Sequence, residues 1–363
     1  MNVYEEILTC YNSLRDETSK KLFIARLSWN LSNDDEYLEQ IEEFLPPKLK
    51  KLGVTNSNVF DESFKYIINK INAEYKQIVV YGLGMYGKIF VDKFSDKSKL
   101  IICDKMISQS TNEYKGVEVI SKEKLLNEYS ELDILVTTLK YENEIVEELM
   151  TAGISDNKII RLSEKSRIFD TDEDSQYFEN DVITPIENEI FIDCGFFKGE
   201  TTKRFVDWCH GNYEKIYAFE PNEENIIEAF KNNEINNIKN LNVINKGVWE
   251  DTRKLQLRIT ERGDSCYICD EGTETISVTS IDEVLGGERA TYIKMDVEGS
   301  EMKALYGAKK TIKKYHPRLA ICIYHKPEDI VEIQRYIISL NPEYKFYIRQ
   351  YSNYTNEMVL YVV

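Results

Sequence analysis

The pattern of hydrophobic and polar positions along the chain changes twice. Near the start, apolar side chains recur at helical spacing at Tyr4, Ile7, Leu8, Tyr11 and Leu14. A second such stretch, SKKLFIARLSWNL, follows, with Ser19 placed to cap its first turn. We therefore predict a helical N-terminal segment over residues 1–72. Its expected role is to cover another part of the protein or to form a contact in a homodimer.

From Gln77 onward, short apolar runs alternate with amphipathic stretches. The runs QIVVY, KLIIC, LDILV and NKIIR each have the length of a strand, and helical stretches lie between them. Such an alternation is typical of a parallel sheet with helices on both faces. We predict a small Rossmann-like domain over residues 73–168.

A second alternation of strands and helices follows an acidic stretch at residues 170–190, which has no sustained period and is predicted to be a connector. The segments EIFIDCGFFKGETT, IYAFEPNEEN, YIKMDVEGSEMKALYGA and RLAICIYHKPED each predict a strand, a turn and a helix. KLQLRI and TISVTSI predict additional strands, and KFYIRQY and EMVLYVV predict an antiparallel pair at the close. We place a second, larger α/β domain at residues 169–363.

The charge of the chain narrows the range of partners. Its 363 residues carry a formal net charge of -17, which repels nucleic acid backbones and anionic lipid surfaces. No apolar run approaches the ~20 residues that a membrane span needs. The opening MNVYEEILTC carries acids where a secretion signal has basic residues, and the seven scattered cysteines favour reduced thiols. We expect a cytoplasmic protein with a small-molecule partner and neither a nucleic acid nor a membrane partner.

The first alternating region contains a complete G-x-G-x-x-G motif formed by Gly82, Gly84 and Gly87. The first two glycines permit a tight turn, and the third lets the following helix pack closely on the strand. Asp104 ends the next strand, where an acid can accept the hydroxyls of a ribose. Two interpretations stay open: the four residues form a second nucleotide site, or the glycines only pack the turn.

The second alternating region carries acidic residues and glycines at the predicted ends of its strands. FIDCGFFKGETT places Asp193 at a strand end, followed by glycines and a helix start, where free N–H groups favour a carboxylate. Asp193 is placed to pair with an ammonium group. Glu220 ends the next strand, where its carboxylate can accept hydrogen bonds from a ribose diol. A ligand with an amino acid, a ribose and an adenine fits this set, which is the composition of S-adenosylmethionine.

These motifs, followed in order by NKGVW, SVTSIDEVL and KMDVEGSE, resemble the FkbM family of S-adenosylmethionine-dependent methyltransferases. The resemblance covers about residues 175–363 and implies the class I methyltransferase fold. Many members are associated with O-methylation of sugars or polyketides, which implies a glycan-linked or natural-product substrate and a place in carbohydrate biosynthesis. The first alternating region more loosely resembles small Rossmann-like domains of glycan-modifying proteins, some of which bind nucleotide sugars.

The resemblance also assigns roles to individual residues. It implies that the methionine moiety is held by Asp193, Gly195, Gly199 and Thr201, the ribose by Glu220, and the adenine by Gly247 and Ser265, with Asp296 facing the methyl group. A sugar hydroxyl is a weak nucleophile, so a positioned general base is expected to contribute ~10²–10⁴-fold. Asp296 and His325 stand at strand ends and are the candidate catalytic residues. The alternative is that each caps the helix that follows it.

The sequence supports a divalent metal in this site less strongly than it supports the cofactor. Asp296 and Glu298 are two residues apart, and with His325 nearby their carboxylates could hold Mg²⁺ beside a substrate diol. The sequence fixes no third ligand, so we assign no metal ligand. The remaining histidines, His210 and His316, are predicted to lie at the surface.

The sequence thus predicts an O-methyltransferase that uses S-adenosylmethionine and a small or glycan-linked hydroxyl substrate. The alternative function is a nicotinamide- or nucleotide-sugar-binding protein that uses the Gly82–Gly87 motif, with a non-catalytic methyltransferase-like half. No Tyr-x-x-x-Lys follows that motif where a short-chain dehydrogenase carries it, so this alternative ranks second. Nitrogen and carbon acceptors stay open.

Overall fold

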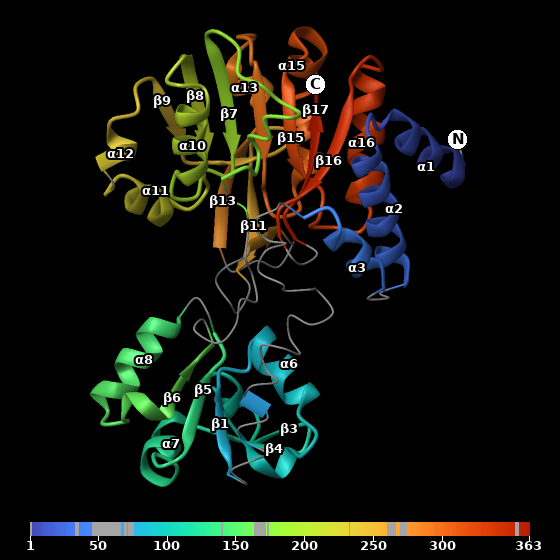
Figure 1. The fold of residues 1–363 in the computed structure, drawn as a ribbon. Helices are drawn as coiled ribbons and strands as arrows, with labels where there is room; N and C mark the ends of the chain where they lie inside the picture. The colour runs from blue at the N-terminus through green and yellow to red at the C-terminus, as the bar shows by residue number, and fades with distance from the viewer. Residues whose placement is uncertain are drawn as a thin grey trace. The chain divides into compact units, whose positions relative to one another are not determined.

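The computed structural model in Figure 1 describes most of the chain. The described residues are 2–32, 36–45, 67–68, 71, 76–138, 141–162, 172, 174–231, 233–259, 266–268, 274–352 and 356–363. The chain forms two compact units. Unit 1 combines Met1–Gly53 with Thr171–Val363, and unit 2 is Val54–Asp170. Unit 1 is therefore discontinuous in sequence, and unit 2 is inserted in it.

A mixed seven-stranded sheet forms the centre of unit 1. Its order is β16 (Phe346–Gln350), β17 (Met358–Val362), β15 (Arg318–Cys322), β14 (Tyr292–Met295), β7 (Glu189–Cys194), β8 (Tyr213–Phe219) and β9 (Leu241–Ile244). Only β17 runs antiparallel to its neighbours in this sheet. The chain order reverses between β7 and β14, and ligands bind beyond the carboxyl ends of the strands at such a point. The predicted α/β Rossmann-like fold and the antiparallel close are confirmed.

Side chains alternate strictly between the two faces of the sheet because a strand has a period of two. In β7, Ile190, Ile192 and Cys194 belong to the core under α14 (Glu301–Gly307), α15 (Lys309–Tyr315) and α16 (Asp329–Leu340). Phe191 points to the other face and stacks on Phe205 of α10 (Glu200–Trp208), with ring centroids 4.1 Å apart. Asp193 shares this second face.

The region in which the sequence predicted additional strands forms a second, smaller sheet and short connecting helices. Three short helices, α11 (Glu223–Ala229), α12 (Asn233–Asn236) and α13 (Ile281–Leu285), connect the strands. A second, four-stranded sheet has the order β10 (Gly247–Val248), β13 (Glu274–Thr279), β11 (Arg253–Ile259) and β12 (Cys266–Ile268). The two strands predicted from KLQLRI and TISVTSI are confirmed as β11 and β13.

The stretch predicted as a connector does more than link two domains. Tyr177, Phe178 and Ile183 are buried in the core on the Phe191 face of the sheet. The segment has no period because it is built of turns, and a few large side chains fix it to the sheet. The expectation of a plain connector at residues 170–190 is wrong for this part.

The N-terminal helices belong to unit 1. Figure 1 shows α1 (Val3–Ser13) and α2 (Glu17–Ser32) beside α16, and α3 (Glu36–Glu42) follows. The Arg15 N–H donates to the carbonyl oxygen of Phe346 at 3.0 Å. The Ser19 hydroxyl accepts from the N–H of Ile348 at 2.8 Å. The helices thus cover the β16 end of the sheet, which is one of the two roles predicted for them.

The cap of α2 differs from the prediction. Ser19 lies inside the helix, and its N–H donates to Oδ1 of Asp16 at 2.7 Å, so Asp16 provides the capping oxygen. The other oxygen of Asp16 pairs with Nη2 of Arg349 at 2.8 Å. Burial opposes ionisation of Asp16, but the bonds from Arg349 and Ser19 outweigh burial and lower its pKa.

Asp16→Asn is expected to lower the free energy of unfolding of unit 1 by about 1.5–3 kcal/mol at neutral pH, because it removes charge-assisted bonds. A depressed pKa contributes stability above the unfolded value of ~3.9 and loses it as pH falls through the folded value. The difference from wild type should therefore shrink below about pH 4. Urea unfolding followed by tryptophan fluorescence measures it, because Trp29, Trp208 and Trp249 all lie in unit 1. An equal loss in the exposed control Asp181→Asn would contradict this expectation.

Unit 2 contains a smaller sheet. Its order is β3 (Glu113–Tyr114), β4 (Val117–Ile120), β2 (Leu100–Cys103), β1 (Ile78–Tyr81), β5 (Asp133–Val136) and β6 (Ile159–Arg161), and only β3 is antiparallel. Its helices are α6 (Met85–Lys93), α7 (Lys122–Glu128) and α8 (Glu142–Thr151), with 3₁₀ turns at Lys97–Lys99, Ile107–Gln109 and Asp156–Lys158. The predicted parallel alternation is confirmed, and β3 and β4 extend it. None of the helices in the described part of the chain combines the length and apolar character that a bilayer crossing requires.

Candidate functional site

The loops after β7 and β14 touch at the reversal point of the main sheet. Gly195 follows β7 with a φ of 91°, and a Cβ there would lie 2.0 Å from the carbonyl oxygen of Asp296. Gly199 has a φ of 89° and precedes α10, where a Cβ would lie 2.7 Å from Ile235 and 2.9 Å from the ring of Phe196. Both positions therefore require glycine, for conformation and for space.

Asp193 is fully buried, and its partners belong to the protein. Its Oδ2 accepts a hydrogen bond from the Thr202 hydroxyl at 2.7 Å, and its Oδ1 lies 3.2 Å from Nζ of Lys294. The two residues are register partners on neighbouring strands, and both point to the Phe191 face. The ammonium that Asp193 pairs with is thus that of Lys294, where the sequence suggested a ligand ammonium.

Lys294 connects this ion pair to the glycine loop. Nζ of Lys294 donates to the carbonyl oxygens of Gly195 at 2.8 Å and Cys194 at 3.2 Å. Burial opposes its charge, but Asp193 and Asp296 outweigh burial and raise the pKa of Lys294. The charged side chain therefore fixes the loop after β7 from beneath. Thr201, the residue expected at the ligand, is half-buried in the first turn of α10 and accepts from Nη2 of Arg204 at 3.2 Å.

Glu220 ends β8 and is nearly buried, with 6% of its surface exposed. Oε2 accepts from the N–H of Phe197 at 2.9 Å. Oε1 accepts from the N–H of Asn222 at 2.9 Å and from Nδ2 of Asn225 at 3.2 Å. Burial is the largest influence and raises the pKa of Glu220, although these donors partly offset it. A carboxylate has about four acceptor sites, so one stays available to a ligand hydroxyl, and a movement of Asn225 releases a second.

The residues expected near the adenine are only partly described. Gly247 lies in β10, and a Cβ there would contact Val278, Ile276 and Pro221, the residue after Glu220. The small side chain thus allows β10 to pack beside the Glu220 turn. Ser265 lies outside the described residues.

Asp296 follows β14, and the hydroxyls of Tyr177 and Tyr324 approach its carboxylate. The Tyr177 hydroxyl donates to Oδ2 at 2.8 Å, and the Tyr324 hydroxyl lies 3.5 Å from Oδ1. A quarter of the Asp296 side chain is exposed, so a ligand can reach it. Burial opposes ionisation, but Lys294, His325 and Tyr177 outweigh it and lower the pKa of Asp296. The carboxylate is therefore ionised at neutral pH.

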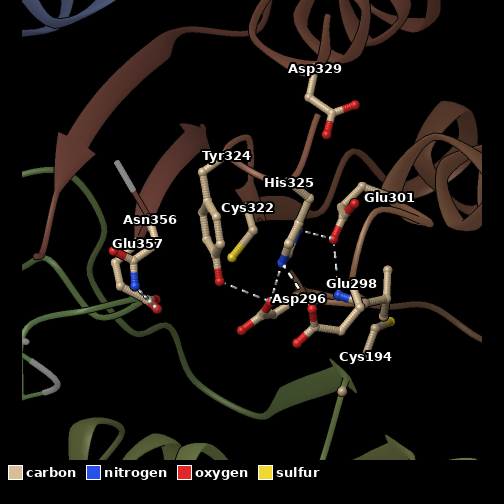
Figure 2. A network of polar contacts seen from close by, with 12 residues as sticks. Cys194, Asp296, Glu298, Glu301, Cys322, Tyr324, His325, Asp329, Asn356 and Glu357 are labelled. Carbon is tan, nitrogen blue, oxygen red and sulfur yellow. Dashed lines mark hydrogen bonds and ion pairs between the residues drawn. The ribbon is translucent and has the colours of Figure 1, made fainter. Parts of the chain in front are cut away.

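His325 follows β15 and stands among three carboxylates, as Figure 2 shows. Its Nδ1 lies 2.9 Å from Oε1 of Glu301, and its Nε2 lies 3.6 Å from both Oδ1 of Asp296 and Oε2 of Glu298. Burial alone would lower the pKa of His325, but Glu301, Asp296 and Glu298 outweigh burial and raise it to about 9. Without another cation, the imidazole therefore keeps its second proton at neutral pH and cannot accept one from a substrate.

The helix-capping alternatives for the two candidate catalytic residues are wrong. The N-cap residue of α14 is Ser300, and that of α16 is Glu328. Asp296 and His325 instead face each other across the ends of β14 and β15. His210 and His316 are both exposed, as predicted.

Sequence reasoning missed several members of this network. Tyr177 comes from the predicted connector, and Glu357 comes from the turn before β17. Burial and the charge of Asp296 raise the pKa of Glu357 to about 7. The sequence pointed to Thr201, but Thr202 is the residue that contacts Asp193. Helix geometry decides which of two adjacent threonines faces the strand. Thr202 ends the FIDCGFFKGETT segment and Glu357 begins EMVLYVV, but nothing in either segment marks these side chains as members of a network, which only the fold brings together.

In unit 2, the glycine motif has a tightly packed turn. A Cβ on Gly87 would lie 2.1 Å from the carbonyl oxygen of Gly82, whose φ is 94°. The carboxylate of Asp104 accepts from the N–H groups of Leu83, Met106 and Ile107 at 2.8, 3.0 and 3.0 Å. Three of about four acceptor sites are thus taken by backbone. Asp104 ties the loops after β1 and β2 together, where the sequence suggested a ribose. Gly84 precedes α6 as its N-cap residue.

The geometry in unit 1 agrees with a comparison to family models. Residues 193–351 match the methyltransferase FkbM domain. The matched segment contains every cofactor-binding residue expected in unit 1, from Asp193 to Asp296, and both candidate catalytic residues. The matched segment thus contains the loops that meet at the reversal point of the sheet. The match covers less than half of the chain and does not extend to unit 2.

A solved structure supports the fold. The crystal structure of methyltransferase FkbM from Methylobacillus flagellatus is similar to the chain with a TM-score of 0.50 and 18% identity, covering 96% of this chain and 99% of that chain. An rRNA methylase from Streptococcus thermophilus is also 18% identical, with a TM-score of 0.33, over 50% of this chain and 88% of that chain. No curated protein matches the sequence.

Proposed function

We propose that unit 1 binds S-adenosylmethionine and transfers its methyl group to a hydroxyl oxygen of a small or glycan-linked substrate. The observation that carries the proposal is the convergence of Gly195, Glu220 and Asp296 at the carboxyl ends of β7, β8 and β14, inside the methyltransferase FkbM domain. This is the crevice where open α/β sheets bind ligands.

Each part of the cofactor has a matching group in this crevice. The first turn of α10 offers backbone N–H groups to the methionine carboxylate. The loop before it is held in place by its own hydrogen bonds, since the N–H groups of Gly195, Phe196, Phe197 and Gly199 all have partners within the protein. The free acceptor site of Glu220 suits the ribose, and the turn around Gly247 suits the adenine. Asp193 acts through Lys294, which fixes the position of the loop, so it is a positioning residue.

The reaction itself is an in-line displacement that depends on alignment. The positive charge on the cofactor sulfur disappears in the transition state, so no strong acid is needed. Asp296 is ionised and partly exposed, and its carboxylate can accept a hydrogen bond from an approaching hydroxyl. Tyr177 and Tyr324 hold that carboxylate in place. A substrate hydroxyl can donate a hydrogen bond to this carboxylate as it receives the methyl group. This contact supports the proposal of O-methylation.

Isothermal titration of the full chain with S-adenosylhomocysteine tests the proposal. We expect one site with a dissociation constant in the micromolar range, roughly 1–100 μM. A titration with NADH in the same buffer is the control, and no heat is expected from it. Absence of S-adenosylhomocysteine binding would overturn the proposal, and binding of NADH alone would favour the nicotinamide alternative.

A further inference from the structure

Three side chains with metal-binding atoms meet at the ends of β14 and β15. Asp296, Glu298 and His325 each offer one ligand atom, and these atoms all lie within 4.8 Å of one another. Nε2 of His325 lies 3.6 Å from an oxygen of Asp296 and 3.6 Å from an oxygen of Glu298, beyond hydrogen-bond distance in both cases. Two donors that bind one cation at ~2.0–2.2 Å lie ~2.8–3.7 Å apart for angles near 90–115°. Both distances from Nε2 of His325 fall in that range.

The second shell around the imidazole is of the kind that supports a metal ligand. Nδ1 of His325 lies 2.9 Å from Oε1 of Glu301, which also accepts from the N–H of Val297 at 2.9 Å. The two atoms are close enough to pair, although the angle at Nδ1 does not meet that of a hydrogen bond. A carboxylate that pairs with one ring nitrogen orients the other nitrogen toward a metal. Figure 2 shows Glu301 on one side of the imidazole and the carboxylates of Asp296 and Glu298 on the other.

Glu301 adds a third, incompletely compensated carboxylate to this cluster. Glu301 is fully buried, and its Oε2 has no hydrogen-bond partner among the described residues. A buried carboxylate oxygen without a partner is costly. Three carboxylates surround the single imidazole, and the buried ammonium of Lys294 is already paired with Asp193. A divalent cation on the imidazole would offset this negative charge.

We propose that Asp296, Glu298 and Nε2 of His325 bind a first-row divalent cation such as Mn²⁺ or Zn²⁺. A ligand set with one imidazole and two carboxylates suits these ions, whereas Mg²⁺ and Ca²⁺ favour sites built of oxygen alone. Three protein ligands leave coordination positions open for a substrate. Part of Asp296 and about half of the Glu298 side chain are exposed, so the open side faces solvent.

The open coordination positions of the cation define a class of substrate that can receive the methyl group. This part of the inference rests on the proposed methyl transfer. A substrate with two neighbouring oxygen atoms, such as a vicinal diol or a hydroxy acid, can bind the cation with both. One of these oxygens is the hydroxyl to be methylated. Its bond to the methyl carbon forms as the carbon–sulfur bond breaks, the sulfur keeps the electron pair, and the hydroxyl proton leaves to water.

Metal binding can be measured without a substrate. The full chain is treated with EDTA, dialysed, and titrated with Mn²⁺ while free Mn²⁺ is followed by electron paramagnetic resonance. We expect one saturable site, with an affinity at least ~10-fold lower in Glu298→Gln, because a charged carboxylate ligand is replaced by a neutral amide. Glu343→Gln is the matched control, since Glu343 is exposed in the turn between α16 and β16 and carries the same charge. Glu298 is half exposed, so circular dichroism should show both variants folded.

A spectroscopic measurement identifies the ligand. Electron spin-echo modulation of bound Mn²⁺ should show one imidazole nitrogen in the wild-type chain and none in His325→Gln. Absence of a saturable Mn²⁺ site, equal affinity in Glu298→Gln and wild type, or no nitrogen coupling would each overturn the metal site. The titration with S-adenosylhomocysteine is independent of these results, so a failed metal site leaves the proposed cofactor site standing, and the reverse also holds.

Discussion

Glu220→Ala should weaken S-adenosylhomocysteine binding by about 100-fold, because a ribose hydrogen bond to a charged group is worth about 1.5–3 kcal/mol and 100-fold corresponds to about 2.7 kcal/mol. The carboxylate also accepts from the N–H of Phe197, in the loop that we assign to the methionine moiety. Its removal therefore takes away the ribose acceptor and loosens the neighbouring loop. Isothermal titration of the full chain measures the change.

The matched variant Glu220→Gln separates these two contributions. The amide keeps one acceptor oxygen for Phe197 or for a ribose hydroxyl, so a smaller loss of about 10-fold is expected. Glu343→Ala, which removes an exposed carboxylate far along the sequence, should leave the affinity unchanged. If Glu220→Ala binds S-adenosylhomocysteine as tightly as the wild-type chain does, the ribose lies elsewhere.

Lys294→Met should destabilise unit 1 by about 3–5 kcal/mol, because it leaves the Asp193 carboxylate buried without its partner. The charged lysine is 2% exposed and the aspartate is fully buried, so water cannot replace the lost ion pair. The lysine also donates to the carbonyl oxygens of Cys194 and Gly195, which lose their donor. Urea unfolding followed by tryptophan fluorescence reports on unit 1 alone.

The double variant Asp193→Asn with Lys294→Met provides the control. If the two residues stabilise each other as a buried ion pair, the loss of unfolding free energy in the double variant should be about 1–3 kcal/mol smaller than the sum of the losses in the two single variants. Additive losses would show that each residue is stabilised by separate contacts. This result would also remove the argument that Asp193 acts through Lys294.

The fold could be predicted from the sequence because its strands are short, apolar and separated by regular helical stretches. The strand-end residues Asp193, Glu220, Asp296 and His325 could be placed for the same reason. Parallel strands bring their carboxyl ends to one edge, so a residue just after a buried run is placed there by topology alone. The order of the motifs then suggested the cofactor.

The partners of those residues could not be predicted, because they depend on register and on segments without a period. Asp193 meets Lys294 only because β7 and β14 pair in one particular register across about a hundred residues of chain. Tyr177 reaches Asp296 from a turn-rich stretch where its φ is 71°. The cap of α2 differed for a local reason: Asp16 precedes Ser19 by one helical turn and also meets Arg349.

The discontinuity of unit 1 affects the order in which the chain can fold as it leaves the ribosome. The α1 and α2 helices depend on contacts with Phe346, Ile348 and Arg349, which are translated more than 300 residues later. At ~5–20 residues per second, the two helices wait roughly 15–70 s for their partners. Unit 2 is continuous in sequence, so it can fold during that interval. The α1 and α2 helices therefore reach their native packing only after β16 has been translated, whereas unit 2 can fold before that.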